Sequence, residues 1–305
     1  MDFHTAYTKF LQAKKAQRLS PHTIEDYTYT YKKFSRFLEE RYSFLPNIED
    51  ISSDDIIDFL AANQEVTKKT LLNYHTGLSA LWTWAVQEGI CETHVVHKVP
   101  RPKPEKREIV PFTRSEILKL LSSAQQGQHP LRDQALILFL LDTGVRASEA
   151  GKIEIRDINF EEQTVLVRGK GSKERVIPFS SETAQAILAY LEERGIQPRS
   201  QKFSRTPLFA SDKGRPLDRH AVRLTLYRIG NRAGVFKVYP HRFRHTFAIQ
   251  FLRNGGNVYA LQRLLGHSTL DMSQHYLHIV LQDVSREHEK ASPVSNWNLT
   301  LGSGP

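Results

Sequence analysis

KVPRPKPEKREIVPF, residues 98–112, separates two parts of the chain that differ in charge and in sequence pattern. The segment contains four prolines and five lysines or arginines, and its few apolar residues follow no regular spacing. Proline fixes its own φ angle and disfavours a helical conformation in the residue before it. The segment is therefore predicted to be an extended, basic linker that could lie along a phosphate backbone.

The residues before this segment show helical patterns. In LSPHTIEDYTYTYKKFSRFLEE, Ser20 is placed to cap a helix whose first position is Pro21, and apolar side chains then recur at spacings of three and four. A second helical pattern starts after a cap at Ser52 or Ser53. Residues 1–98 are therefore predicted to form a small, all-helical domain.

After the linker, the spacing of apolar residues is helical except in one stretch, where it is that of β-strands. Thr113 and Glu116 have the spacing of a capping box, and the apolar run Ala135–Leu141 is typical of a buried helix. QTVLVRGKGSKERVIPF instead predicts two strands, Thr164–Arg168 and Arg175–Phe179, joined by a glycine-containing turn. The predicted fold is mainly α with a small antiparallel β-sheet. Its expected parts are a helical domain at 1–98, a linker at 99–112, a second domain at 113–291 and a flexible tail at 292–305.

Charge is distributed unevenly along the 305 residues, whose net charge is +9. Residues 1–100 contain 11 Lys or Arg against 13 Asp or Glu, whereas residues 101–305 contain 31 against 20. Such an asymmetry indicates a polyanionic partner for the second part of the chain. Charge alone does not establish nucleic-acid binding, because many basic proteins bind no polyanion.

The sequence also predicts a compartment. Its longest apolar run has seven residues, whereas a membrane helix needs about 20. The first residues, MDFHTAYTKF, lack the apolar core of a signal peptide. The single cysteine, Cys91, excludes an internal disulfide and any cysteine-based zinc site, which fits a reducing compartment. A cytoplasmic protein without membrane attachment is therefore expected.

Four stretches carry polar residues that suit one reaction. They are LDTGVRASEA, VRGKGSKER, HRFRHTF and LLGHSTLDMSQHY. Together they supply two guanidiniums, two imidazoles, one ammonium and one phenol, namely Arg146, Arg244, His241, His267, Lys170 and Tyr276. In a helix, the spacing of three between His241 and Arg244 places both on one face, and Glu149 follows Arg146 at the same spacing.

These groups suit the attack of a hydroxyl on a phosphodiester. The transition state carries extra negative charge on the nonbridging oxygens, and planar arginine forks bind such oxygens without a metal. A phenol with a pKa of about 10 becomes a nucleophile once deprotonated, which nearby cations and a basic histidine favour. Tyr276 is the predicted nucleophile. Lys170, on a hairpin tip, is the predicted donor of a proton to the departing 5′ oxygen, with Lys173 as the alternative.

Each residue also has an ordinary structural explanation. Arg146 and Glu149 could form only a surface ion pair, worth about 0–1 kcal/mol, and Lys170 could be a solvated turn residue. His241 and His245 have a spacing that suits zinc, but no glutamate follows His241 as in H-E-x-x-H, so no metal is expected. The ordinary explanation is preferred for any residue singly, whereas the six together favour the reaction.

The order Arg146, Lys170, His241-x-x-Arg244, His267 and Tyr276 resembles that of the tyrosine recombinase (phage integrase) family. TGVRASEA, GKGSKER, HRFRHTFA and LLGHSTLDMSQHY are similar to its motifs, and the likeness covers nearly the whole chain. The two-domain layout is most similar to the Xer-like and integrative-element branch. The resemblance implies a SAM-like core-binding domain at 1–98 and a catalytic domain at 113–291, forming a C-shaped clamp on DNA.

The resemblance also implies a mechanism. Tyr276 would attack DNA, form a 3′-phosphotyrosyl bond and free a 5′-hydroxyl, without ATP or another cofactor. Four protomers would exchange strands through a Holliday junction on inverted-repeat half-sites, each passing a C-terminal helix, here Leu281–Ala291, to its neighbour. Such a protein would be nucleoid-associated.

The expected DNA contacts lie on the linker and the hairpin, and Glu149 is expected to support the site from behind. The contact residues are Arg101, Lys103, Lys106, Arg107, Lys173 and Arg175. Two other functions stay open at this point: relaxation of DNA by a type IB topoisomerase and DNA binding without chemistry. The target sequence and the biological role, such as dimer resolution, integration by a mobile element or inversion, are not encoded in any readable motif.

Overall fold

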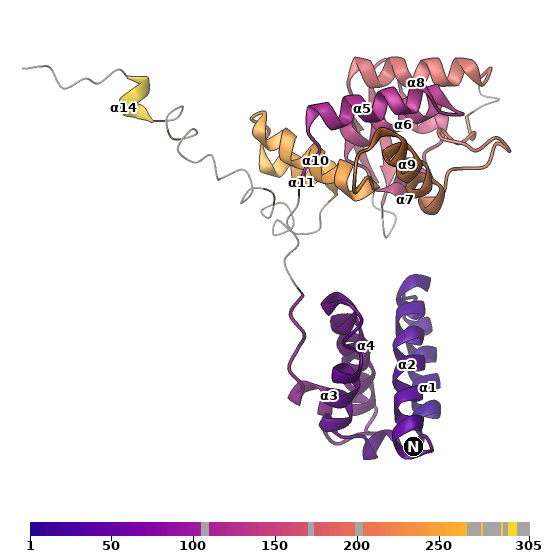
Figure 1. The fold of residues 1–305 in the computed structure, drawn as a ribbon, viewed down its shortest axis with the longest axis vertical. Coiled ribbons are helices and arrows are strands. Elements are labelled where there is room, and N and C mark those ends of the chain that lie inside the picture. Colours follow the sequence, from indigo (N-terminus) through magenta and orange to yellow (C-terminus); the bar gives the residue numbers. More distant parts are fainter. Residues whose placement is uncertain are drawn as a thin grey trace, which may run out of the picture. The chain divides into compact units, whose positions relative to one another are not determined.

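The computed structural model of the chain describes residues 1–104, 110–169, 174–198, 204–266, 276, 288 and 292–297. The chain forms two compact units, Met1–Glu108 and Ile109–Pro305 (Figure 1). Each unit has a hydrophobic core of its own. Among the described helices, none combines the length and the apolar composition that crossing a membrane requires.

The N-terminal unit is helical, as predicted. Its α-helices, in the described residues, are α1 (Phe3–Ala16), α2 (Pro21–Tyr42), α3 (Ser53–Ala62) and α4 (Lys68–Gln87), with the short 3-10 helices η1 (Ile48–Asp50) and η2 (Val95–Lys98). The predicted cap of α2 is confirmed, because the Ser20 side chain accepts a hydrogen bond from the backbone N–H of Thr23. At α3 the cap is Ser52, which forms a capping box with Asp55.

Aromatic rings form the centre of this unit. The Phe34 ring lies 5.0 Å from the Phe59 ring and 5.6 Å from the Phe3 ring, measured between centroids. Trp82 is fully buried beside them. Because these rings come from α1, α2, α3 and α4, burying them fixes all four helices around one core.

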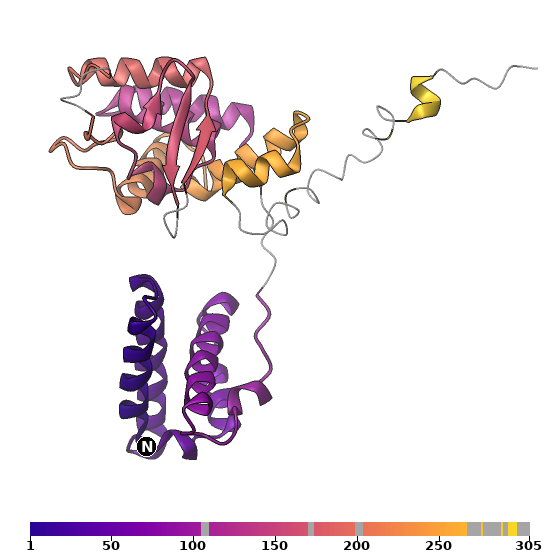
Figure 2. The same cartoon turned by 180° about the vertical axis from the view of Figure 1, so that it is seen from behind.

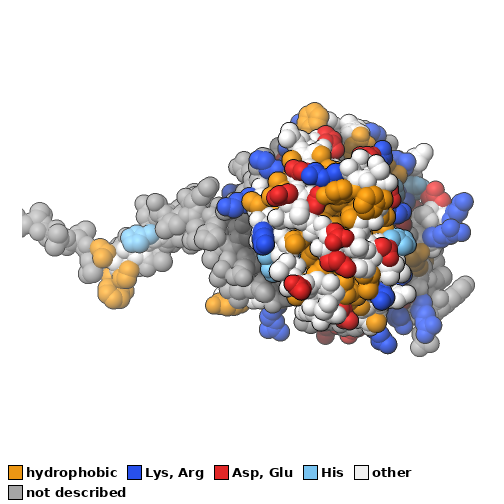
Figure 3. Space-filling view, turned by 90° about the horizontal axis from the view of Figure 1, so that it is seen from below, with side chains coloured by type: hydrophobic (Ala, Val, Ile, Leu, Met, Phe, Trp, Pro, Cys, Tyr) orange, Lys and Arg blue, Asp and Glu red, His pale blue; other side chains and the backbone are white. Residues whose placement is uncertain are grey.

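The surface of this unit does not carry one sign of charge on the face drawn in Figure 3. Acidic, basic and apolar side chains lie side by side there. This mixture agrees with the nearly balanced charge of residues 1–100, with 11 basic and 13 acidic residues.

The C-terminal unit contains helices and a small sheet. Its described elements are α5 (Arg114–Gln125), α6 (Pro130–Thr143), α7 (Ala147–Ala150), η3 (Ile155–Asp157), β1 (Ile158–Asn159), β2 (Thr164–Arg168), β3 (Glu174–Pro178), α8 (Ser181–Glu193), α9 (Arg219–Ala233), α10 (Pro240–Arg253), α11 (Val258–Leu265) and α14 (Pro293–Asn296). The capping box of Thr113 and Glu116 at the start of α5 is confirmed. Helix α6 packs against α5, α8 and α10, which explains why its apolar run is buried on nearly every side.

The sheet is antiparallel with strand order β1-β2-β3, as the sequence predicts for its two longer strands. Val165 is paired with Ile177, and both side chains are buried in the core, whereas the neighbouring Val176 is 59% exposed. Figure 2 shows the strands lying along one side of the helices. Strand β3 starts one residue earlier than predicted. Strand β1 was not predicted, because two residues are too short to show an alternating pattern.

Candidate active site

Arg146 reaches the site from a tight connection between two helices. Helix α6 ends at Thr143, its C-cap Gly144 has a φ of 60°, and Arg146 is the N-cap of α7. A Cβ atom on Gly144 would lie 2.5 Å from Cδ1 of Phe247, so both the backbone conformation and the close packing require glycine. Glu149 accepts the backbone N–H of Arg146 at 2.8 Å and its Nη1 at 2.9 Å. One carboxylate therefore holds both the backbone and the side chain of Arg146.

Helix α10 carries His241 and Arg244 on one face, as their spacing predicts. The Arg244 guanidinium donates from Nη1 to the Gly144 carbonyl at 2.8 Å and from Nη2 to the Leu265 carbonyl at 2.7 Å. Arg244 is only 2% exposed. Its buried fork therefore joins α10 to the ends of α6 and α11.

Arg146, His241 and Arg244 line one pocket of about 470 Å³. In the part of the chain that the structure describes, its lining also includes Arg219 and Arg223 from α9, and it includes no acidic side chain. The sequence-based reasoning did not single out these two arginines, although they stand four residues apart in RHAVR and therefore on one helix face. The pocket is thus suited to an anion.

The electrostatics of the pocket follow from burial and from this concentration of positive charge. Burial and the neighbouring charge of Arg146 lower the pKa of Arg244 to about 10. Burial also lowers the pKa of His241, and the charges of Arg244 and Arg146 lower it further. His241 is therefore neutral at pH 7 in the free protein. An anion in the pocket would relieve the repulsion among these groups.

Tyr276 lies in a small hydrophobic cluster with residues of α10 and α11, and it is 5% exposed. Its phenol oxygen is 2.7 Å from Nδ1 of His245, one turn along α10 from His241. Burial raises the pKa of Tyr276, and the charges of Arg244 and Arg146 act in the opposite direction. His245 was considered from the sequence only for its zinc spacing, so its contact with the phenol was missed.

The sequence and the fold both match known proteins. Residues 111–282 match the model of the phage integrase family, and residues 7–92 match the model of the phage integrase N-terminal SAM-like domain. The tyrosine recombinase XerC of Oceanobacillus iheyensis is 32% identical over 298 residues, which cover 96% of each chain. The chain belongs to the phage integrase family. It is a tyrosine recombinase, an enzyme that cuts and rejoins DNA.

Solved structures show the same fold. The Tn1549 transposon integrase in complex with a circular intermediate DNA has a TM-score of 0.75 at 22% identity, covering 96% of this chain and 100% of the integrase chain. A lambda integrase dimer bound to a COC′ core site has a TM-score of 0.73 at 20% identity, with coverage of 89% and 97%. The predicted pairing of a helical core-binding domain with an integrase catalytic domain is confirmed.

In this recombinase, Arg175 has surroundings that differ from those expected of a DNA contact. Its side chain is 12% exposed and forms an ion pair with Glu149. The Nη1 and Nη2 atoms lie 3.1 and 2.8 Å from the two Glu149 oxygens, and Nε donates to the Leu264 carbonyl at 2.8 Å. The structure thus directs this fork to protein groups. From the sequence, Arg175 was only one more cation on a basic hairpin.

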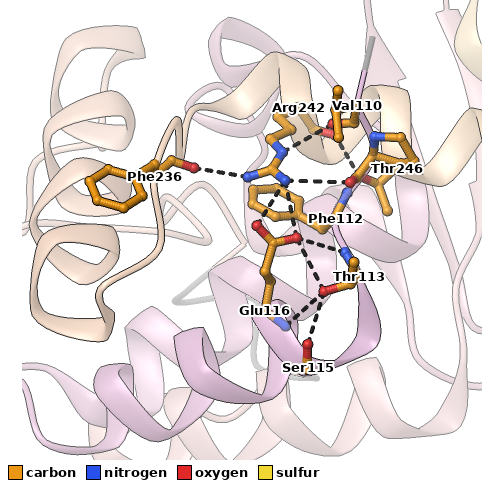
Figure 4. Close-up of polar contacts among 9 residues, drawn as sticks. Val110, Phe112, Thr113, Ser115, Glu116, Phe236, Arg242 and Thr246 are labelled. Atoms are coloured by element: carbon orange, nitrogen blue, oxygen red, sulfur yellow. Dashed lines mark hydrogen bonds and ion pairs between the residues drawn. The ribbon is translucent and has the colours of Figure 1, made fainter.

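The Arg242 side chain does not line the pocket, and its positive charge is paired with Glu116. Its guanidinium lies 3.9 Å from the centre of the Phe112 ring and contacts both oxygens of Glu116, at 2.9 and 3.0 Å (Figure 4). It also donates to the carbonyls of Val110 and Phe236, at 3.1 and 2.9 Å. Since Arg242 and Arg244 are two residues apart, they point to different sides of α10. The end of the predicted linker is therefore attached to the helix that carries the site.

Several predicted residues lie outside the described part of the chain: Lys170, His267, Lys173, Lys106 and Arg107. Of the remaining predicted DNA contacts, Arg101 and Lys103 are exposed. Within the described residues, no group of three or more His, Cys, Asp or Glu side chains is arranged to hold a metal ion.

Proposed function

We propose that this recombinase cuts duplex DNA with Tyr276 as its nucleophile. The observation that carries the proposal is the position of the phenol. Tyr276 packs against α10 and α11, and its oxygen lies 2.7 Å from Nδ1 of His245, on the helix that also carries His241 and Arg244. Burial raises the pKa of Tyr276, while the charges of Arg244 and Arg146 act to lower it. The same two guanidiniums line the anion-suited pocket with His241.

In the proposed reaction, the Tyr276 phenol passes its proton to His245, 2.7 Å away, while its oxygen attacks the scissile phosphorus and the bond to the 5′ oxygen breaks. A 3′-phosphotyrosyl bond forms, and Lys170 gives a proton to the departing 5′ oxygen. Arg146 and Arg244 bind the nonbridging oxygens, with His241 and His267 as further hydrogen-bond partners. Arg244 has five N–H donors, and two of them are used by the carbonyls of Gly144 and Leu265. Its remaining donors are assigned to the phosphate.

Rejoining reverses these steps on a second strand. The 5′-hydroxyl of a partner strand attacks the phosphotyrosine, so the energy of the phosphodiester is retained. We assign to this chain a tetramer on inverted-repeat half-sites, which exchanges strands through a Holliday junction and passes residues 281–291 between protomers. The support is that relatives were solved as a lambda integrase dimer on a core site and as XerH on a palindromic difH substrate.

The proposed organisation keeps the boundaries read from the sequence. Residues 1–98 bind DNA, 99–112 link the domains, 113–291 carry out catalysis and 292–305 form a tail. The two domains close around the duplex as a clamp, and the enzyme acts in the cytoplasm on the nucleoid. The anion-suited pocket of the second unit supports catalysis there.

A suicide substrate tests the nucleophile. Bound duplexes are first selected from a random pool, and the selected site is then nicked next to the cut position so that cleavage traps the protein on DNA. The natural chain should form a covalent adduct, and Tyr276→Phe should form none. Tyr227→Phe is the matched control, because Tyr227 is 57% exposed. An adduct with the Tyr276→Phe variant would show that another residue attacks.

The cations are tested on the same substrate. Arg146→Lys and Arg244→Lys should reduce adduct formation by at least about 100-fold and duplex binding much less, because a point charge cannot reproduce the arginine fork. Equal losses of binding and cleavage would contradict a catalytic role. Relaxation of supercoiled DNA without strand exchange would instead identify a topoisomerase.

A further inference from the structure

Glu149 is a buried carboxylate shared by two arginines. It is 5% exposed and accepts from Arg146 at 2.9 Å and from Arg175 at 3.1 and 2.8 Å. Burial raises the pKa of Glu149, but the hydrogen bonds from Arg175 and from the backbone of Arg146 lower it more, so the net pKa is below its usual value. Glu149 is therefore ionised at neutral pH, and its charge is divided between the two arginines.

Arg175 also holds the end of α11. The last carbonyls of a helix have no partner within the helix. In α11 the Leu264 carbonyl accepts from Arg175 Nε at 2.8 Å, and the Leu265 carbonyl accepts from Arg244 Nη2 at 2.7 Å. The guanidinium of Arg175 also packs on Gly266, where a Cβ atom would lie 3.2 Å from Nη1. The residue after Gly266 is His267, which the sequence assigns to the site.

We propose that Arg175 is a positioning residue, not a DNA contact: it gives Glu149 its second positive partner and fixes the end of α11. Through Glu149 it orients Arg146, and through the Leu264 carbonyl it holds the end of α11, whose Leu265 carbonyl accepts from Arg244. The inference rests on the proposed function, because it assumes that Arg146 binds the scissile phosphate. It connects β3 to two separate parts of the site by one side chain.

The physical reason lies in the needs of a buried carboxylate. A buried charge that keeps only one partner is costly, and arginine pairs best with a carboxylate through two parallel bonds. With Arg175 in place, Arg146 gives Glu149 one side-chain N–H, and its side chain stays 35% exposed toward the pocket. Without Arg175, Glu149 would draw the Arg146 fork into a two-bond pair. The phosphate would then lose donors although Arg146 itself is unchanged.

The first test is the adduct rate on the suicide substrate. Arg175→Gln should cleave at least about tenfold more slowly than the natural chain, as expected when a donor is misplaced by about 1 Å. Arg175→Lys should lie between the two, because lysine keeps the charge but cannot reproduce the two bonds to Glu149 together with the bond from Nε to Leu264. Arg156→Gln is the control in the same unit, with an arginine that is 46% exposed and paired with Glu154. It should stay within about threefold of the natural chain.

The second test separates positioning from DNA contact and does not require cleavage. Each phosphate contact adds about 0.9 to the slope of log affinity against log salt concentration. Arg175→Gln should therefore keep the slope of the natural chain on any duplex. A decrease of about 0.9 would assign Arg175 to a phosphate and overturn the inference, even if the proposed cleavage by Tyr276 failed.

The third test is a double-mutant cycle with Glu149. If Arg175 acts through Glu149, the double variant Glu149→Gln with Arg175→Gln should lose less cleavage than the product of the two single losses. A loss of cleavage in the double variant equal to the product of the two single losses would show that Arg175 does not act through Glu149. Thermal unfolding of each variant shows whether it is folded. If Arg175→Gln is not, the cycle is measured with Arg175→Lys and the salt slope with the uncharged Arg175→Met.

Discussion

Arg242→Met is predicted to destabilise the C-terminal unit without changing the N-terminal one. Methionine keeps much of the length and apolar volume of arginine, so the loss comes from the polar contacts. The Arg242 side chain is 9% exposed, and its guanidinium serves Glu116 and the carbonyls of Val110 and Phe236 (Figure 4). These partners lie on segments that are brought together only by the fold.

The expected magnitude follows from these contacts. Removing one partner of a buried ion pair costs about 3–5 kcal/mol. Glu116 is 26% exposed and also accepts from the backbone N–H of Thr113 at 2.8 Å, so part of its charge remains solvated or bonded. We therefore expect Arg242→Met to lower the free energy of unfolding by about 2–4 kcal/mol. Arg156→Met is the control, since Arg156 is 46% exposed in its pair with Glu154. It should cost less than about 1 kcal/mol.

The assay must separate the two units, because they can unfold independently. Trp82 and Trp84 are buried in the N-terminal unit, so with the third tryptophan replaced in every chain (Trp297→Phe) fluorescence reports that unit in a urea titration. Far-UV circular dichroism reports both units. The backbone N–H of Phe112 donates to Thr246 at 2.8 Å, and its hydrogen exchange reports the attachment directly. The variant should shift the dichroism transition and accelerate this exchange while the fluorescence midpoint stays unchanged.

The effect should also depend on pH. Burial raises the pKa of Glu116, but hydrogen bonds from Thr113 and Arg242 lower it more, so its folded pKa is below the usual 4.5. A carboxylate with a depressed pKa adds stability above its unfolded pKa, and this stability is lost as the pH falls through the folded pKa. The difference in free energy of unfolding between the natural chain and Arg242→Met should therefore become smaller at acidic pH. A difference below about 0.5 kcal/mol at pH 7 would refute the assigned role of Arg242.

Two further predictions follow from the same site. Gly144→Ala should slow adduct formation and lower the free energy of unfolding more than Gly234→Ala does. Both glycines have a positive φ, but only at Gly144 would a Cβ atom lie against Phe247, at 2.5 Å. Equal losses of stability in urea titrations would show that Phe247 moves away freely. The pKa of His241 lies below 6.5 because of burial and the charges of Arg244, Arg146 and Arg219. The unfolded chain therefore binds the histidine proton more readily than the folded one. The free energy of unfolding should fall as the pH drops through 6.5. His241→Asn should reduce this pH dependence, and an unchanged dependence would contradict the assigned surroundings of His241.

The sequence by itself determined the elements whose interactions are local. Ser20 bonds a backbone N–H three residues away, and Thr113 and Glu116 bond each other across the same interval. The alternation of the buried Val165 and Val167 with less buried neighbours likewise defined a strand. Such contacts are encoded in spacing, because helix and strand geometry bring fixed intervals of the chain together. The order of the six site residues also sufficed for the family.

Only the tertiary structure decided which distant acceptors each buried guanidinium contacts. Arg244 bonds a carbonyl 100 residues away, Arg175 bonds one 89 residues away, and Arg242 pairs with a carboxylate 126 residues away. In the sequence Arg175 and Arg242 are alike, because each is an arginine in a basic stretch, and the motif that contains Arg244 does not name its carbonyl partners. What separates the three is the set of acceptors that each one contacts. A guanidinium removed from water must find acceptors in the protein, and the packing of α10 against α6 and α11, and of α11 against β3, determines which acceptors lie within reach.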